Sequence, residues 1–307
     1  MATSLLELQN WAIATFERRF GRQPTVTGFA PGRVELLGNH TDHNRGLVLS
    51  AAIDRYTSVA AALTDTRQVR VWSEQLGSDD EFALPNVTPL PRGSWSNYVR
   101  GSVSALIDSG VVVAGFDAAI VGDVPMGGGL SSSASLQCAV AMAVLGMFGA
   151  GAGLEPEGMQ LAELLRRAEN RFAGVQCGVL DHFSSLFGRT DHALFLDCDT
   201  LAHDALPWGA DTPTIVVCDS NAPRELTKGK YNERRAECDA ASEYLHRMNP
   251  RLACGVVPSL RDVPLKLFLD HQSQLEPAIA RRVRHVLTEN QRVLTGVELL
   301  RRSGDVR

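Results

Sequence analysis

The sequence predicts an α+β fold in two lobes. Strand patterns and helix patterns follow one another in mixed order, without the regular alternation that builds a doubly wound parallel sheet. The chain has 307 residues, of which 44% are hydrophobic and 21% charged, and this composition is typical of globular proteins. At about 150 residues per domain, the length has room for two domains. We place the boundary near residue 200, with an N-terminal lobe at residues 1–200 and a C-terminal lobe at residues 201–307.

The predicted strands are short runs rich in β-branched and other apolar residues, bounded by glycine, proline or polar turns. They are residues 25–37, 56–63, 69–72, 116–121, 193–196 and 214–218. The first two flank a polar turn that contains glycine and histidine. The last is a nearly continuous apolar run.

The predicted helices show apolar residues three or four positions apart. They are residues 1–20, 95–106, 131–148, 161–172, 231–248 and 278–301. Ser4 and Glu7 have the spacing of a capping box at the start of the first helix. The third helix is almost entirely apolar, so we expect it to be buried on every side.

Composition argues against several classes of protein. The formal net charge of −5 disfavours a nucleic-acid binder, which would carry a basic face. No run approaches the roughly 20 apolar residues of a membrane span. Glu7 and Glu17 speak against a transit peptide, and the six cysteines include no C-x-x-C pair, as expected of thiols in a reducing compartment. We therefore expect a cytoplasmic monomer that binds neither nucleic acid nor membrane.

A glycine-rich turn joins the strand at residues 116–121 to the most apolar helix, and from residue 125 it reads PMGGGLSSSAS. Three consecutive glycines let backbone N–H groups close on a ligand, and the helix N-terminus adds a partial positive charge. Together they suit a phosphate group. On the glycines alone, a flexible turn with serine capping is an equal alternative. The Walker sequence and the dinucleotide G-x-G-x-x-G spacing are both absent.

Residues 31–44, PGRVELLGNHTDHN, gather a cation, carboxylates, imidazoles and amides around one turn. Such groups can fix the hydroxyls of a sugar and supply positive charge for phosphoryl transfer. Taken alone, the segment fits a polar surface hairpin somewhat better.

A third segment, residues 168–183, reads AENRFAGVQCGVLDHF. Asp181 follows apolar residues just after a glycine turn, so its carboxylate is either a helix N-cap or a catalytic group in a cleft. For an isolated residue, the N-cap is the better interpretation.

In combination, the three segments strongly resemble the GHMP small-molecule kinases, and within them the galactokinases. Residues 33–44 are similar to the galactokinase signature, 125–135 to the ATP loop and 168–183 to the catalytic segment. Residues 95–101 (WSNYVRG) and 231–235 (YNERR) match as well. The resemblance implies the two-lobed GHMP kinase fold, with an N-terminal lobe like domain 2 of ribosomal protein S5 and a ferredoxin-like C-terminal lobe.

The resemblance also implies an activity, the transfer of phosphate from ATP to the anomeric hydroxyl of galactose or a close relative, with Mg²⁺. By matching position, Asp181 would orient or deprotonate that hydroxyl, and Arg33 would stabilise charge on the transferring phosphoryl group. The residues implied to wrap the ATP phosphates are Gly127, Gly128, Gly129, Leu130, Ser131, Ser132 and Ser133. Weaker candidates on the nucleotide side are Ser73 and Tyr98. The implied Mg²⁺ ligands are Ser133 and Glu169, a hard-oxygen set. The positions that align with sugar contacts are Asn39, His40, Thr41, Asp42, Gly178 and Tyr231.

The chain departs from the galactokinase pattern at several positions. Asn39 stands where glutamate is usual, and Glu35 where asparagine is usual. An amide keeps an acceptor oxygen but loses the charge, so the affinity for the sugar, or the choice of sugar, is open. His43 and His182 replace the usual tyrosine and glutamine. No ligand spacing is found for six histidines, which we expect on the surface or in packing positions: His182, His192, His203, His246, His271 and His285.

Family members carry a third glycine-rich motif near the C-terminus, and here the glycines after Gly178 lie far apart. From this we expect an incomplete second lobe with uncovered apolar surface. Two alternatives to a galactokinase follow from the departures. One is a sugar- and ATP-binding sensor or remnant without turnover. The other is a kinase of a related sugar, such as an N-acetylhexosamine or arabinose.

Overall fold

The computed structural model describes residues 3–149, 158–209, 213–218, 230–249 and 258–304. Its centre is a seven-stranded sheet. Six strands follow the order β4-β3-β5-β2-β6-β7, and β1, the seventh, pairs with β2. The strands are β1 (Val26–Leu37), β2 (Leu47–Leu63), β3 (Gln68–Ser73), β4 (Ser78–Ala83), β5 (Phe116–Gly122), β6 (His192–Asp197) and β7 (His203–Pro207). Only β3 and β5 pair in parallel, and the other pairings among these strands are antiparallel.

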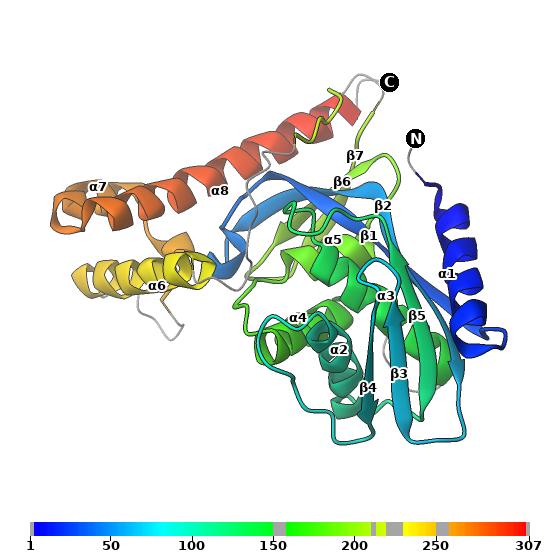
Figure 1. Cartoon of the computed structure of the whole chain (residues 1–307). Coiled ribbons are helices and arrows are strands. Elements are labelled where there is room, and N and C mark those ends of the chain that lie inside the picture. Colours follow the sequence, from blue (N-terminus) through cyan, green and yellow to red (C-terminus); the bar gives the residue numbers. More distant parts are fainter. Residues whose placement is uncertain (1–2, 150–157, 210–212, 219–229, 250–257, 305–307) are drawn as a thin grey trace.

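The helices are α1 (Leu5–Phe20), α2 (Ser96–Asp108), α3 (Ser132–Phe148), α4 (Met159–Phe172), α5 (Leu180–Phe187), α6 (Lys230–Met248), α7 (Leu265–His271) and α8 (Pro277–Gly304). Helices α2 to α5 gather on one face of the sheet, and α1 and α8 lie on the other (Figure 1). Helix α3 is buried around most of its circumference, as its apolar sequence predicts.

The long strand β2 pairs with three other strands of the sheet. One edge pairs with β1, while the other pairs with β6 near its start and with β5 near its end. The β1–β2 register shifts between Pro31 and Arg33 and again between Glu35 and Leu37. Such irregularities re-aim side chains, and these two flank residues 33–35, the start of the polar signature.

The C-terminal helices form a core of their own and also pack on the sheet. Helices α6, α7 and the first half of α8 enclose a buried cluster that includes Leu245, Phe268 and Val286. The second half of α8 places Val293 and Val297 against Leu47 and Leu49 of β2 and against side chains of β6 and β7. Helix α8 therefore bridges the helical layer and the strand that follows the signature turn (Figure 1).

Most predicted elements are confirmed, including the capping box in which Ser4 and Glu7 bind each other's backbone. The predicted strand at residues 214–218 is wrong. No described strand pairs with it, and Val216 is 76% exposed, so its apolar run lacks the partner that a strand needs. The sequence patterns missed β4, β7, α5 and α7. The division near residue 200 stays a prediction, and β6 and β7 pair across it.

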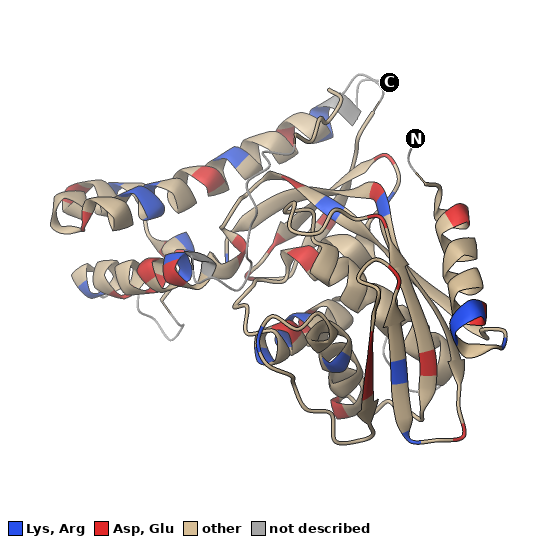
Figure 2. Cartoon of the chain, viewed as in Figure 1, with Lys and Arg blue, Asp and Glu red and all other residues tan. Residues whose placement is uncertain are grey.

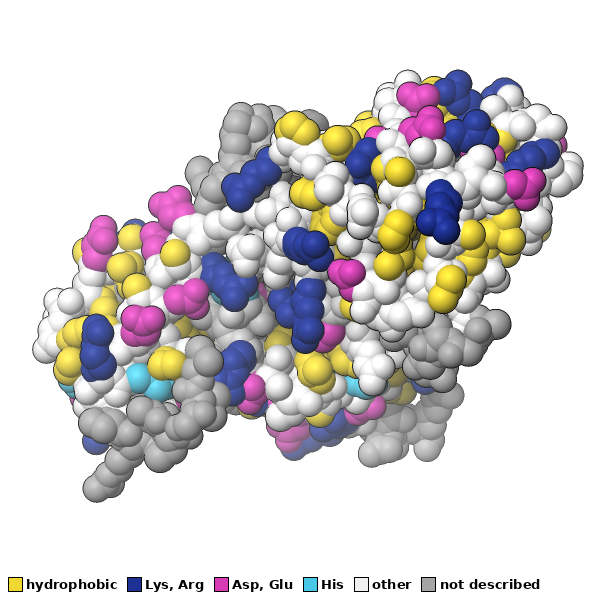
Figure 3. Space-filling model, turned by 90° about the horizontal axis from the view of Figure 1, so that it is seen from below, with side chains coloured by type: hydrophobic (Ala, Val, Ile, Leu, Met, Phe, Trp, Pro, Cys, Tyr) yellow, Lys and Arg dark blue, Asp and Glu magenta, His cyan; other side chains and the backbone are white. Residues whose placement is uncertain are grey.

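The described surface carries both signs of charge. Along α6 and α8 basic and acidic residues are interspersed (Figure 2), and the face seen from below mixes basic, acidic and apolar side chains (Figure 3). Among the described helices, none combines the length and apolar character that a membrane crossing requires. The described cysteines are free thiols, and Cys218 is exposed.

Candidate active site

The centre of the candidate site is an ion pair between Arg33 of β1 and Asp181 of α5. A second guanidinium nitrogen of Arg33 donates to the carbonyl of Gly129 at 2.7 Å. Arg33 is buried, whereas the side chain of Asp181 is 28% exposed. Burial disfavours the charged form of Arg33, but the carboxylates of Asp181 and Glu35 outweigh it and raise the pKa of Arg33 above its usual value. The pair therefore holds both charges in a partly open site.

Asp181 is not the N-cap of α5. That position belongs to Val179, and Asp181 lies in the first helical turn with its carboxylate on Arg33. Of the two interpretations open for the isolated residue, the geometry is that of a group in a cleft.

Backbone contacts join β1 directly to the glycine-rich loop. The N–H of Arg33 donates to the carbonyl of Leu130 at 3.1 Å. A Cβ on Gly32 would lie 2.7 Å from that same carbonyl oxygen, so only glycine allows the approach. Arg33 is thus tied to the loop by its main chain as well as by its side chain.

The glycine-rich loop ends at the N-terminus of α3. Gly127 and Gly129 have φ values of 73° and 75°, and Ser131, the N-cap, has φ 58° with no side-chain cap on the helix. The buried hydroxyl of Ser131 has no hydrogen-bond partner among the described residues. Left-handed backbone and an uncapped helix start leave N–H groups available for an anion. The arrangement of the seven predicted loop residues, from Gly127 to Ser133, suits phosphate groups.

Ser133 and Glu169, the expected Mg²⁺ ligands, lie on neighbouring helices. Glu169 of α4 is buried and accepts from the amide of Gln137 at 2.6 Å, and Gln137 lies one turn after Ser133 on α3. The carbonyl oxygen of Gln137 is buried without a described partner. Hydroxyl, carboxylate and amide oxygens are hard donors of the kind Mg²⁺ prefers, so the residues fit this ion.

The two weaker nucleotide candidates are Ser73 and Tyr98. Ser73 ends β3 beside Ile120 of β5, and β5 leads directly into the glycine-rich loop. Tyr98 of α2 is half-buried, and burial together with the nearby Glu169 carboxylate raises the pKa of its phenol above the usual value. Both positions stay predictions.

The signature turn, residues 38–47, connects β1 to β2 and is called the sugar loop below. The carboxylate of Asp42, in the sugar loop, accepts a hydrogen bond of 3.1 Å from the N–H of Gly178. A Cβ on Gly178 would lie 2.2 Å from the Asp42 carboxylate, so the close approach requires glycine. The contact joins the sugar loop to the segment that leads into Asp181.

The remaining sugar-site candidates differ in how they are placed. The amide of Asn39 donates to Glu35 at 2.7 Å. Thr41 is fully buried, and its hydroxyl binds the carbonyls of Gly38 and Leu47, so it shapes the sugar loop from within. The backbone of Tyr231 belongs to α6, and its side chain lies outside the described residues.

Two titratable side chains of the sugar loop, Asp42 and His43, lie 3.3 Å apart. Burial opposes ionisation of both groups, but their mutual contact wins, lowering the pKa of Asp42 to about 2 and raising that of His43 to about 9. Burial lowers the pKa of His40 to about 4, helped by nearby cations that include Arg234. Around neutral pH the pair is charged and His40 is neutral.

Glu35 differs from Asp42 in the direction of its pKa shift. Burial, and then repulsion from Asp42, raise its pKa to about 7, with Arg33 and Asn39 opposing the shift. One of its oxygens is buried without a described partner. Because the folded pKa lies above the ordinary value of 4.5, the stability that comes from protonation is complete below pH 4.5 and is lost as the pH rises through 7.

The Glu35→Gln variant should therefore gain stability over the parent as the pH rises. We expect its free energy of unfolding, relative to the parent, to increase by about 3 kcal/mol between pH 4.5 and pH 8, because glutamine never ionises. Urea unfolding of both proteins at the two pH values measures this difference. A difference that stays constant with pH would contradict the assigned shift.

Sequence patterns missed several residues of the site. His182, expected in a packing position, is indeed fully buried, but its ring lies 3.3 Å from Glu169. Its place directly after Asp181 was an available signal. Gln137 could have been found as the one amide side chain within an apolar helix. Two residues of α6 hold the segment before Asp181: Asn232 binds the backbone of Gly174 and Gln176, and Arg235 binds Gln176. Both lie in the YNERR segment, so its resemblance to the family was the available signal.

Comparisons with known proteins agree with this geometry. The galactokinase galactose-binding signature matches residues 14–63, and the N-terminal domain of GHMP kinases matches residues 97–189. A galactokinase from Roseiflexus sp. (strain RS-1) is 43% identical over 291 residues, which is 95% of this chain and 71% of that protein.

Solved structures give the same picture. Lactococcus lactis galactokinase complexed with galactose superposes with a TM-score of 0.79 at 32% identity, covering 94% of this chain and 73% of that one. Methanococcus jannaschii mevalonate kinase, at 16% identity and a TM-score of 0.52, covers 89% of this chain and 79% of its own and shares the fold alone. Three findings agree: the 43% identity to the Roseiflexus galactokinase over 95% of this chain, the galactokinase signature over β1 and β2, and the contact between Arg33 and Asp181. The chain therefore belongs to the galactokinase family of GHMP sugar kinases.

Proposed function

We propose that this sugar kinase transfers the γ-phosphoryl group of ATP to the anomeric hydroxyl of D-galactose. The observation that carries the proposal is the Arg33–Asp181 pair, because it lies where the sugar loop, the glycine-rich loop and the segment before α5 converge. A phosphoryl transfer needs its acceptor and its donor at one charged centre.

The two charged residues take complementary roles in the proposed mechanism. Asp181 is partly exposed and would accept or orient the proton of the attacking hydroxyl. Arg33 is fixed by Asp181 and by the Gly129 carbonyl, so its charge is already in place when charge builds up on the transferring group. Little reorganisation of the protein is then needed during the reaction.

Binding of ATP is assigned to the glycine-rich loop and the start of α3, because Gly129 and Leu130 of this loop bind Arg33. Ser133 and Glu169 would hold Mg²⁺, which would neutralise charge on the phosphates. The supports are the oxygen donor set and the side-chain carbonyl of Gln137 beside Glu169, which has no hydrogen-bond partner among the described residues.

A second candidate, a kinase of a related sugar, is favoured by the contact between Asn39 and Glu35. Asn39 uses one amide hydrogen on Glu35, so it offers the sugar an amide where galactokinases usually offer a carboxylate. Hydrogen bonds to charged groups contribute about 1.5–3 kcal/mol against about 1 kcal/mol for neutral ones. The exchange is large enough to alter the choice between sugars.

A sugar panel tests the proposal. ADP release is measured with ATP, Mg²⁺ and either galactose, arabinose or an N-acetylhexosamine, and we expect kcat/KM to be highest for galactose. A higher value for another sugar would establish the second candidate. Binding of galactose and ATP without ADP release would instead identify a sensor.

The double variant Glu35→Asn with Asn39→Glu tests the origin of the preference. It restores the usual arrangement of the family, and we expect it to raise kcat/KM for galactose about tenfold over the parent, as one charged hydrogen bond allows. The single variant Asn39→Glu is the control. It places two carboxylates in contact and should weaken galactose binding. An unchanged ranking of sugars in the double variant would show that this pair does not set the preference.

A further inference from the structure

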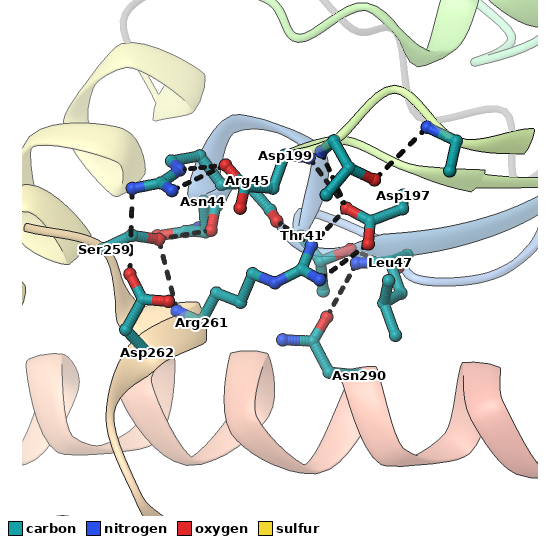
Figure 4. Close-up of polar contacts among 12 residues, drawn as sticks. Thr41, Asn44, Arg45, Leu47, Asp197, Asp199, Ser259, Arg261, Asp262 and Asn290 are labelled. Carbon is teal, nitrogen blue, oxygen red and sulfur yellow. Dashed lines mark hydrogen bonds and ion pairs between the residues drawn. The ribbon is translucent and has the colours of Figure 1, made fainter. Parts of the chain in front are cut away.

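The sugar loop is held from outside by side chains of the C-terminal part of the chain, and Figure 4 shows three of them, Ser259, Arg261 and Asn290. Five of its backbone groups bind side chains that lie more than 200 residues later in the chain. The N–H of Gly38 donates to Glu289 at 3.0 Å and that of Leu47 to Asn290 at 2.9 Å. The other three are carbonyls: Asn39 to His285 at 2.7 Å, Asn44 to Ser259 at 2.6 Å, and Arg45 to Arg261 at 2.8 Å.

The conformation of the sugar loop needs such support. Gly38, His40 and Arg45 have φ values of 99°, 62° and 57°, and the left-handed region is unfavourable for the last two. Such conformations persist where surrounding contacts over-determine them. The contacts within the loop come mainly from Thr41, so much of the remaining constraint comes from the C-terminal helices.

Among the five side chains that bind the backbone of the sugar loop, Glu289 is a buried carboxylate on α8. It lies one helical turn after His285, so two successive turns of α8 bind the adjacent residues Gly38 and Asn39. Its other carboxylate oxygen pairs with Arg292 of the same helix. A carboxylate that accepts a backbone N–H makes a stronger hydrogen bond than a neutral acceptor.

We propose that Glu289 is a positioning residue that sets the sugar affinity of the site by holding the backbone of the sugar loop. Glu289 binds the backbone just before Asn39, His40 and Asp42, the candidates for contact with the sugar. The glycine-rich loop is held instead by Arg33, on β1. Loss of Glu289 should therefore affect the sugar and spare the nucleotide. This inference rests on the proposed function.

The Glu289→Ala variant tests the proposal in ligand binding. We expect the Kd for galactose to rise about tenfold or more, because one charged hydrogen bond is lost and tenfold corresponds to about 1.4 kcal/mol. The Kd for ATP should stay within about twofold and kcat at saturating galactose within about threefold, since Glu289 acts through the loop. Glu289→Gln keeps an acceptor oxygen for Gly38 and should recover most of the affinity.

A matched control is available on the same helix. Glu298 is exposed and pairs only with Arg302 among the described contacts, so Glu298→Ala removes the same side chain from α8 without touching the sugar loop. We expect it to bind galactose like the parent. Equal effects of Glu298→Ala and Glu289→Ala would overturn the proposal, as would a parallel loss of galactose and ATP affinity.

Hydrogen exchange provides a readout that needs no ligand. Peptides covering residues 38–47 should exchange faster in Glu289→Ala than in the parent, while peptides of α3 stay protected. Unchanged exchange in the sugar loop would overturn the proposal. If the parent bound no galactose, the proposed function would be wrong, and the exchange measurement would still decide whether Glu289 holds the loop.

Discussion

The Asp181→Asn variant is expected to lower kcat about a thousandfold, the range in which a positioned general base contributes. Asparagine has nearly the same shape, but it cannot take a proton and carries no charge toward Arg33. Galactose and ATP should still bind, because the sugar loop and the glycine-rich loop are held by other contacts. Steady-state ADP release, with binding of each ligand measured separately, checks the expectation.

The consequence for folding can be separated from the consequence for catalysis. Removing one partner of a buried ion pair lowers the free energy of unfolding by about 3–5 kcal/mol when the other charge is left alone. In Asp181→Asn, Arg33 keeps its hydrogen bond to the Gly129 carbonyl, has Glu35 nearby and faces a partly open site, so the loss of stability should be smaller. Asp80 and Arg100 form a second buried pair, with 2.7 Å between Nε and Oδ2. Asp80→Asn is the matched control, expected to cost stability while leaving kcat near the parent value.

Variants of Arg33 test whether it acts together with Asp181. Arg33→Met should lower kcat by a similar factor, and the double variant with Asp181→Asn should lose little more than either single variant, since residues that act as a unit are not additive. Independent, multiplicative losses would mean that the two residues do not act as a pair. An Asp181→Asn variant with parental activity would show that another group takes the proton.

The centre of the site could be predicted from sequence because its residues lie in three compact segments. Arg33, Ser133, Glu169 and Asp181 each sit within a run whose pattern resembles the family, and the structure brings Arg33 and Asp181 into contact. Their adjacency came from that resemblance. Periodicity alone places Arg33 on a strand and leaves Asp181 open between a cap and a catalytic group.

Long-range partners are what the sequence could not predict. The helical pattern of α8 shows that residues such as Val286 and Val293 face inward, but it does not show that Glu289 meets Gly38, 251 positions earlier in the chain. Likewise β4 was missed because half of its sequence, SDDEFA, is acidic. Its inward carboxylate, Asp80, is tolerated because Arg100 of α2 neutralises it.

The failed strand at residues 214–218 has a related cause. A continuous apolar run predicts a buried strand only if another strand lies beside it. Residues 214–218 have none among the described strands, and Val216 and Val217 are exposed. A local pattern can show that a segment suits a sheet. Whether a sheet edge is present beside it depends on the rest of the fold.

The Gly28→Ala variant is expected to cause a large loss of stability. A Cβ at Gly28 of β1 would lie 2.4 Å from the carbonyl oxygen of Ala139 and 2.5 Å from the amide nitrogen of Ala143, both backbone atoms of α3. Backbone cannot rotate away, so α3 must move off the sheet. We expect a loss of about 3 kcal/mol, the upper part of the range for overpacking. Urea unfolding measures it.

Gly146→Ala is the matched control, because Gly146 lies in α3 itself. Its new Cβ would be 3.7 Å from the nearest atom, an ordinary contact, so the variant should gain about 0.5–1 kcal/mol from helix propensity. Destabilisation by Gly28→Ala no greater than the effect of the control would show that α3 adjusts freely. If α3 instead moves, Ser131 and the start of the helix move away from Arg33. The KM for ATP should then rise in the folded Gly28→Ala protein and stay unchanged in Gly146→Ala, because the close packing at Gly28 fixes α3, whose start is the proposed phosphate site, against β1, which carries Arg33.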